Sequence, residues 1–173
     1  MTDQSGGHIF IALVIFSMIV LGKVKRLRIY IDTSVVGGCF DEEFVLESKT
    51  LFTMAREEKI IFLISDLLIE ELELAPLEIQ NELTALPPEC FETITRSKET
   101  ERLRDVYLAS NVVAPTHSND AHHVAIATVA QADLIVSWNF KHIVHFDKIR
   151  AFNAVNLREG YPFIDIRSPK EVI

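Results

Sequence analysis

The 173-residue chain has few cysteines and few basic residues, and both shortages exclude classes of protein. Its two cysteines, Cys39 and Cys90, are too few for a disulfide framework, and their spacing differs from that of zinc or redox pairs. A reducing, cytoplasmic location is therefore expected. With 25 acidic residues against 17 lysines and arginines, the net charge of −8 argues against a protein that coats nucleic acid electrostatically. An enzyme that contacts only a short stretch of nucleic acid is still compatible with this charge.

The chain also lacks a long apolar run, since the run from Ile9 to Leu21 is too short to cross a bilayer comfortably. Asp3 is the only charge before it, so it lacks the basic start of a signal peptide. We interpret residues 1–22 as an extension separate from a domain at 23–173. The extension is explained either by a start codon assigned too early, with Met18 as the true start, or by a weak anchor at a membrane surface. Of these, the first is preferred, and membrane association is not expected.

The rest of the sequence alternates between strand-like and helix-like segments, and 49% hydrophobic residues suffice for one substantial core. The run at 60–64 is apolar throughout, which is typical of a strand buried on both faces. This alternation predicts an α/β fold, a three-layer α/β/α sandwich with a mainly parallel central sheet. Strands are expected at 28–31, 60–64, 91–95, 134–137 and 163–166, and helices at 44–59, 67–75, 98–110, 120–131 and 148–157. Pro76 either ends one helix or opens the next.

Asp32 follows the first predicted strand directly, at the position where ligands usually bind in a parallel sheet. The next two residues, Thr33 and Ser34, carry hydroxyls that could hold a carboxylate or a metal-bound water. A single Asp after a strand is more often a turn or cap residue. Asp32 is therefore a candidate only if other acids join it.

Glu71 is the second candidate, because helical spacing separates it from its neighbour Glu70. Asp66, Glu70 and Glu73 form a polar stripe, since residues three or four apart share a helix face. A carboxylate directed toward a core is costly unless a cation or hydrogen-bond donors meet it, so Glu71 is favoured over Glu70. Its expected neighbours are apolar: Leu67, Leu68, Leu74 and Ala75.

Two further polar residues lie where this sheet edge is expected. Asp120 opens an alanine-rich helix that would pack closely on the sheet, although an Asp in a first turn is often only a favourable cap. Asn139 follows the strand at 134–137 as Asp32 follows the first strand. Its amide oxygen is a neutral ligand or hydrogen-bond acceptor, and the simpler interpretation is a turn residue.

In order and spacing, these segments resemble the PIN-domain family, and within it the bacterial toxin-like ribonucleases of the virulence-associated protein C type. The resemblance covers about Leu27 to Ile173. It is carried by the run from Ile29 to Ser34, by Ser65 with Glu71 six residues later, by Asp120, and by the strand and turn from Leu134 to Phe140. It implies a PIN-like fold and a metal-dependent ribonuclease, the toxin of a toxin–antitoxin pair.

The resemblance also implies roles for individual residues. Asp32, Glu71 and Asp120 become the catalytic acids and the ligands of Mg²⁺ or Mn²⁺, with Ser34 in support. Asn139 takes the place of a fourth acid, a departure that weakens any second metal site. Three converging carboxylates repel one another, and a hard dication with oxygen ligands relieves that repulsion. The implied partners are an RNA substrate and a small antitoxin that inserts a basic side chain into the acidic pocket, and we expect a homodimer.

Other functions fit the residues less well. A PIN-like module that binds RNA or protein without cleaving it is the main alternative, because Asn139 replaces an acid. A phosphatase with an aspartate nucleophile needs a second Asp two positions after the first, where this chain has Ser34. A receiver domain needs an acidic pair on an earlier strand. No zinc site is expected, because neither His122 and His123 nor His142 and His145 have structural-zinc spacing with cysteines.

Overall fold

The computed structural model describes residues 25–173, so the predicted extension at 1–22 lies outside the described residues. In this part of the chain, five strands form one sheet in the order β3-β2-β1-β4-β5, and every neighbouring pair is parallel. Central β1 has Ile29 opposite Phe62 of β2 and Leu134 of β4. The strands are β1 (Leu27–Ile31), β2 (Ile60–Ser65), β3 (Phe91–Ile94), β4 (Leu134–Val136) and β5 (Asp165–Arg167).

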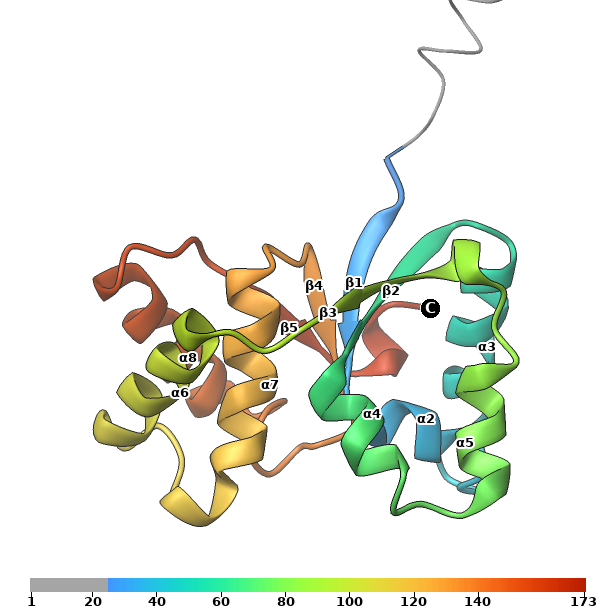
Figure 1. Ribbon diagram of the computed structural model, residues 1–173, viewed down its shortest axis with the longest axis horizontal. Coiled ribbons are helices and arrows are strands. Elements are labelled where there is room, and N and C mark those ends of the chain that lie inside the picture. Colours follow the sequence, from blue (N-terminus) through green and yellow to red (C-terminus); the bar gives the residue numbers. More distant parts are fainter. Residues whose placement is uncertain (1–24) are drawn as a thin grey trace, which may run out of the picture.

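Helices cover both faces of this sheet, and Figure 1 shows the strands between the two helical groups. One core joins the sheet to α2 (Thr33–Gly38), α3 (Val45–Arg56) and α5 (Leu77–Thr84). The other joins it to α6 (Lys98–Ala109), α7 (Ser118–Val129) and α8 (Phe146–Arg158). The short α4 (Asp66–Leu72) gives Leu68 and Leu72 to the first core and Leu67 to the second. The predicted three-layer α/β/α sandwich is thus confirmed.

Several predicted elements differ from the observed ones. Helix α2 was not predicted, because its six residues, TSVVGG, include two β-branched valines and two glycines, all poor helix formers. Pro76 opens α5 as its N-cap. The last strand begins at Asp165, and Phe163, placed in it by the sequence, is 68% exposed.

The predicted apolar surroundings of Glu71 are partly wrong. Helix α4 ends at Leu72, so Leu74 lies beyond the helix and is 91% exposed. The side chain of Glu71 instead faces residues of α2 and α7. An early helix end changes the direction of every later side chain, which is why spacing alone misplaced Leu74.

The strand order positions the functional edge of the sheet. The chain runs outward from β1 to β2 and β3, and then crosses to β4 on the other side of β1. The carboxyl ends of β1 and β4 therefore lie side by side where the order reverses, which is where open parallel sheets bind ligands. Within residues 25–173, none of the helices has the length and apolar character needed to cross a membrane.

Candidate active site

Asp32 lies at the end of β1 and is only 5% exposed. Both of its carboxylate oxygens accept hydrogen bonds from serine hydroxyls. Ser34 Oγ lies 2.5 Å from Oδ1, and Ser137 Oγ lies 2.7 Å from Oδ2. Ser137 follows β4 as Asp32 follows β1. The two serines thus fix the carboxylate between the ends of the two strands.

This carboxylate is nevertheless poorly stabilised in its charged form. Burial raises the pKa of Asp32, while nearby His123 and the hydrogen bonds from Ser137 and Ser34 lower it. The nearby charge of Glu71 raises it further, and the net pKa lies above its usual value. A cation beside Asp32 would favour the charged form and remove this cost.

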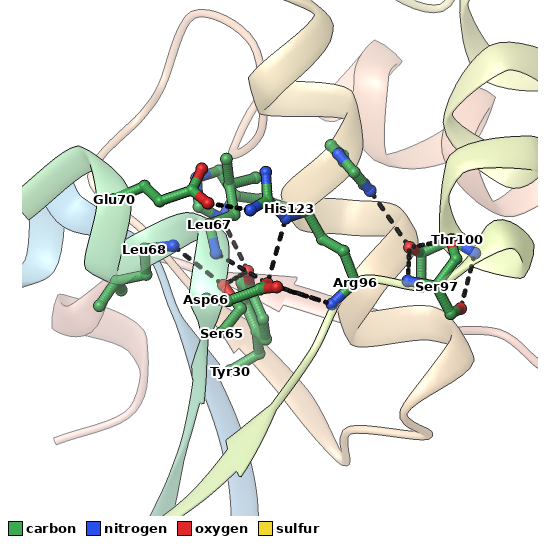
Figure 2. A network of polar contacts seen from close by, with 11 residues as sticks. Tyr30, Ser65, Asp66, Leu67, Leu68, Glu70, Arg96, Ser97, Thr100 and His123 are labelled. Atoms are coloured by element: carbon green, nitrogen blue, oxygen red, sulfur yellow. Dashed lines mark hydrogen bonds and ion pairs between the residues drawn. The ribbon is translucent and has the colours of Figure 1, made fainter.

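Glu71 occupies the last turn of α4 and is held by three donors. The Thr33 hydroxyl donates to Oε2, Asn119 Nδ2 donates to Oε1 over 3.1 Å, and His123 Nε2 lies 3.1 Å from Oε2. Burial raises the pKa of Glu71, but His123, Thr33 and Asn119 outweigh that effect and lower it to about 2. Glu71 therefore stays ionised at neutral pH. By contrast, Glu70 is exposed and pairs with Arg96, which also contacts Asp66 (Figure 2).

A buried chain of hydrogen bonds orients His123 toward Glu71. The Tyr30 hydroxyl lies 2.7 Å from His123 Nδ1 and 2.8 Å from Ser65 Oγ (Figure 2). Burial raises the pKa of Tyr30, so the phenol stays protonated. Because an ionised Glu71 only accepts hydrogen bonds, His123 Nε2 carries the proton directed at it. In the neutral tautomer, Nδ1 then accepts from Tyr30.

Asp120 is the third residue of α7, since this helix begins at Ser118 and not at Asp120 as predicted. Its Oδ1 accepts a hydrogen bond of 2.8 Å from Asn139 Nδ2, and its Oδ2 lies 3.3 Å from His117 Nδ1. The amide oxygen of Asn139 accepts from the backbone N–H of His142. As placed, Asn139 therefore positions Asp120 through its amide nitrogen, while its oxygen accepts one backbone hydrogen bond.

The predicted acids meet at one edge of the sheet but do not form a tight cluster. A hydrogen-bonded path leads from Asp32 through Ser137 and Asn139 to Asp120, and Asn119 joins the same helix turn to Glu71. Their oxygens suit a hard dication, and because burial raises the pKa of Asp32, a cation beside it would favour its charged form. In residues 25–173, however, the one group of at least three His, Cys, Asp or Glu with ligand atoms within 4.8 Å of one another is His117, Asp120 and His142. The metal-ligand roles of Asp32, Glu71, Asp120 and Asn139 stay predictions.

Three residues of this site had no role in the sequence-based prediction. Ser137 could have been found, because it ends a strand as Asp32 does. His123 is three residues after Asp120 and so shares its helix face. No pattern in the sequence indicates that Asn119 donates to Glu71.

Comparisons with known proteins agree with this geometry. A family model described as "PIN domain" matches residues 28–141. Among solved structures, a chain of VapBC2 from Rickettsia felis, crystallised bound to a DNA fragment from its promoter, has a similar fold with a TM-score of 0.50. The two chains are 14% identical, and the match covers 82% of this chain and 98% of that one. No curated protein matches at a significant level. The family match spans β1 to the turn after β4, including every acid described above, and the chain therefore belongs to the PIN-domain family.

Proposed function

We propose that this protein is an Mg²⁺- or Mn²⁺-dependent endoribonuclease that hydrolyses RNA phosphodiester bonds. The observation that carries the proposal is the pair Asp32 and Glu71. Both lie at the switch point of a parallel sheet, where burial is the main cause of the raised pKa of Asp32 and the charge of Glu71 adds to it. Asp120 is linked to Asp32 through Ser137 and Asn139.

The residues of the proposed site would have different roles, some binding the metal and others holding the metal ligands in place. Asp32, Glu71 and Asp120 would hold the dication, which supplies a more acidic water and stabilises charge developing on phosphate. Ser34 and Ser137 keep the Asp32 carboxylate in one orientation. Because His123, Asn119 and Thr33 already satisfy Glu71, that carboxylate stays ionised whether or not a metal is bound.

Family membership and the fold shared with VapBC2 support a more specific role, the toxin of a toxin–antitoxin pair acting in the cytoplasm. The partner would be a small antitoxin that places a basic side chain against the acidic edge of the sheet, and the toxin would be a homodimer. The net charge of −8 suits a basic ligand of this kind.

The direct test is cleavage of a mixed RNA pool by the purified protein with Mn²⁺ or Mg²⁺, compared with the Asp32→Asn variant and with a chelator. We expect cleavage by the wild type that the chelator and the variant both abolish. Equal cleavage by wild type and variant would mean that a contaminating nuclease is responsible, and the proposal would be wrong.

One observation favours a binding module without catalysis as the second candidate. The amide oxygen of Asn139 already accepts from the His142 backbone, so the position of the fourth acid carries a neutral, hydrogen-bonded oxygen in place of a carboxylate. Binding of radiolabelled RNA with no loss of length, in Mg²⁺ and in Mn²⁺, would support this alternative over the nuclease.

A further inference from the structure

Two histidines flank Asp120 on the exposed side of the site. His117 belongs to the short 3-10 helix Pro115–His117 that precedes α7, and His142 lies in the turn after β4. Their rings are stacked, with centroids 3.5 Å apart and planes 24° apart. One ligand atom from each histidine and one from Asp120 lie within 4.8 Å of one another, and all three residues are half-buried.

In the described part of the chain, protein contacts leave ring nitrogens of both histidines without a partner. Across residues 25–173, the His142 ring makes no hydrogen bond to protein, and the His117 ring makes its one polar contact with Asp120. Two imidazoles with uncommitted nitrogens thus lie against one carboxylate, within reach of solvent. This donor set is typical of sites for transition-metal dications, which imidazole suits, whereas Mg²⁺ and Ca²⁺ prefer oxygen ligands.

The distances also match a metal site. Nitrogen and oxygen ligands lie about 2.1 Å from zinc, so two ligands of a tetrahedral ion are roughly 3.4 Å apart. His117 Nδ1 and Asp120 Oδ2 are already 3.3 Å apart. The remaining ligand atom comes from His142 and lies within 4.8 Å of the other two. Because the rings are stacked, they must rotate to turn both nitrogen lone pairs toward one ion.

Asn139 supplies the supporting contacts that such a site needs. It donates to Asp120 Oδ1, which fixes the carboxylate and leaves Oδ2 facing His117. Its oxygen accepts from the His142 backbone N–H, which fixes the turn that carries the third ligand. Hydrogen bonds behind the ligands of a metal orient them in this way. The amide therefore suits this position better than a carboxylate, which has no donor for Asp120.

We propose that His117, Asp120 and His142 bind a transition-metal dication such as Zn²⁺, with water completing the coordination. This site goes beyond the proposed nuclease and does not depend on it, since its ligands are mainly nitrogen and two of them have no part in the acidic site. Asp120 is shared. If the proposed function holds, Zn²⁺ bound here withdraws Asp120 from the nuclease metal and inhibits cleavage.

The test is binding of Co²⁺ and Zn²⁺ to the full-length protein in excess Mg²⁺, followed by Co²⁺ absorption bands and by Zn²⁺ calorimetry. We expect one equivalent of Zn²⁺ to bind and to displace Co²⁺. The variants His117→Ala and His142→Ala should each lose at least about tenfold in affinity. His145→Ala is the matched control, because this exposed histidine is three residues from His142 and outside the cluster, and it should bind like the wild type.

The acid-site variants separate this proposal from the nuclease. Asp32→Asn and Glu71→Gln should bind Zn²⁺ with unchanged affinity even if both are inactive. Absence of binding in the folded wild type, or binding that His117→Ala and His142→Ala leave intact, would overturn the proposal. A loss of Zn²⁺ affinity in Asp32→Asn equal to that in His142→Ala would place the ion among the acids, and the proposal would again be wrong.

Discussion

The hydroxyl of Ser137 donates a 2.7 Å hydrogen bond to the Asp32 carboxylate, and so joins the ends of β1 and β4 across 105 positions of sequence. Together with Ser34, it gives each carboxylate oxygen of this buried acid one hydrogen bond without neutralising its charge. Ionised Asp32 at the switch point is therefore costly in the absence of a cation, because burial raises its pKa.

We predict that Asp32→Asn stabilises the metal-free protein. A raised pKa in the folded state means that charged Asp32 costs stability above that pKa, and the cost disappears as the pH falls through it. The variant should melt about 2–4 °C higher at pH 7, which for a protein of this size corresponds to about 1 kcal/mol in the free energy of unfolding. Its advantage should vanish in acid, and Mn²⁺ should no longer stabilise it.

Asp133 is the control for this measurement. It is paired with Lys25 and the Arg28 backbone; burial raises its pKa, but those contacts lower it overall. Asp133→Asn should therefore melt lower than the wild type. A lower melting temperature for Asp32→Asn as well would show that the Asp32 charge is well compensated.

Glu71→Gln should abolish RNA cleavage, whereas Glu70→Gln should keep most of it. Glu71 is directed at α2 and α7 by Thr33, Asn119 and His123, and Glu70 is directed at Arg96 on the surface. Initial rates on one RNA substrate measure the difference, with circular dichroism to confirm folding. If Glu70→Gln is the inactive variant, the assignment of Glu71 to the acidic site is wrong.

Asn139→Asp should destabilise the metal-free protein and strengthen its response to Mn²⁺. The new carboxylate loses the donor that holds Asp120 and adds a like charge beside it. A cation that binds only the folded state then restores more stability than in wild type. Asn139→Ala removes the same donor without the charge, and should show the destabilisation but not the larger Mn²⁺ response. Identical Mn²⁺ titrations for all three proteins would show that Asn139 has no part in metal binding and is only a turn residue.

His122 should make stability fall between pH 6.5 and pH 4. Burial is the main reason that the pKa of His122 is lowered to about 4, and the nearby Arg104 and Arg96 add to it. In this window the unfolded chain binds a proton that the folded protein does not, so stability is lost as the pH falls. Urea unfolding should show a loss of about 2 kcal/mol that is absent in His122→Gln. The exposed His145→Gln should keep the wild-type slope, and equal slopes for all three would refute the assignment.

Two adjacent glycines of α2 should respond oppositely to alanine. A Cβ on Gly38 would lie 2.4 Å from Ser48 Oγ and 2.7 Å from Trp138 Nε1, which are hydrogen-bonded to each other. Gly38→Ala should therefore cost about 1–3 kcal/mol. At Gly37 a Cβ meets nothing within 4 Å, so Gly37→Ala should gain about 0.5–1 kcal/mol from helix propensity. Chemical denaturation of both variants measures the contrast.

Much of the fold was predictable, because its inner strands are short, largely apolar runs that the sheet buries. The run at 60–64 became β2, buried along its whole length. Helix α2 was not predictable from propensity, since the packing of Val35 and Val36 in the first core stabilises it. Leu74 was misplaced because helix periodicity does not show where a short helix ends.

The site was predictable to the extent that strand ends indicate it. Asp32 follows an obvious strand, so its position could be read from the sequence. The donors that set its properties come from elsewhere in the chain, and Ser137 becomes a neighbour only once β4 pairs with β1. Likewise, His117 and His142 are 25 residues apart, with no periodic relation, and only the turn after β4 brings their rings together.

The late position of β4 in the chain has a consequence for synthesis on the ribosome. A nascent chain that stops before Leu134 already contains Asp32, Glu71 and Asp120, but it lacks β4, one of the two strands that pair with β1. Pairing between parallel strands far apart in sequence is slow and cannot begin until both have emerged. Truncated translation products would therefore carry all three acids and no assembled site. The proposed nuclease site therefore cannot assemble until β4 has been synthesised.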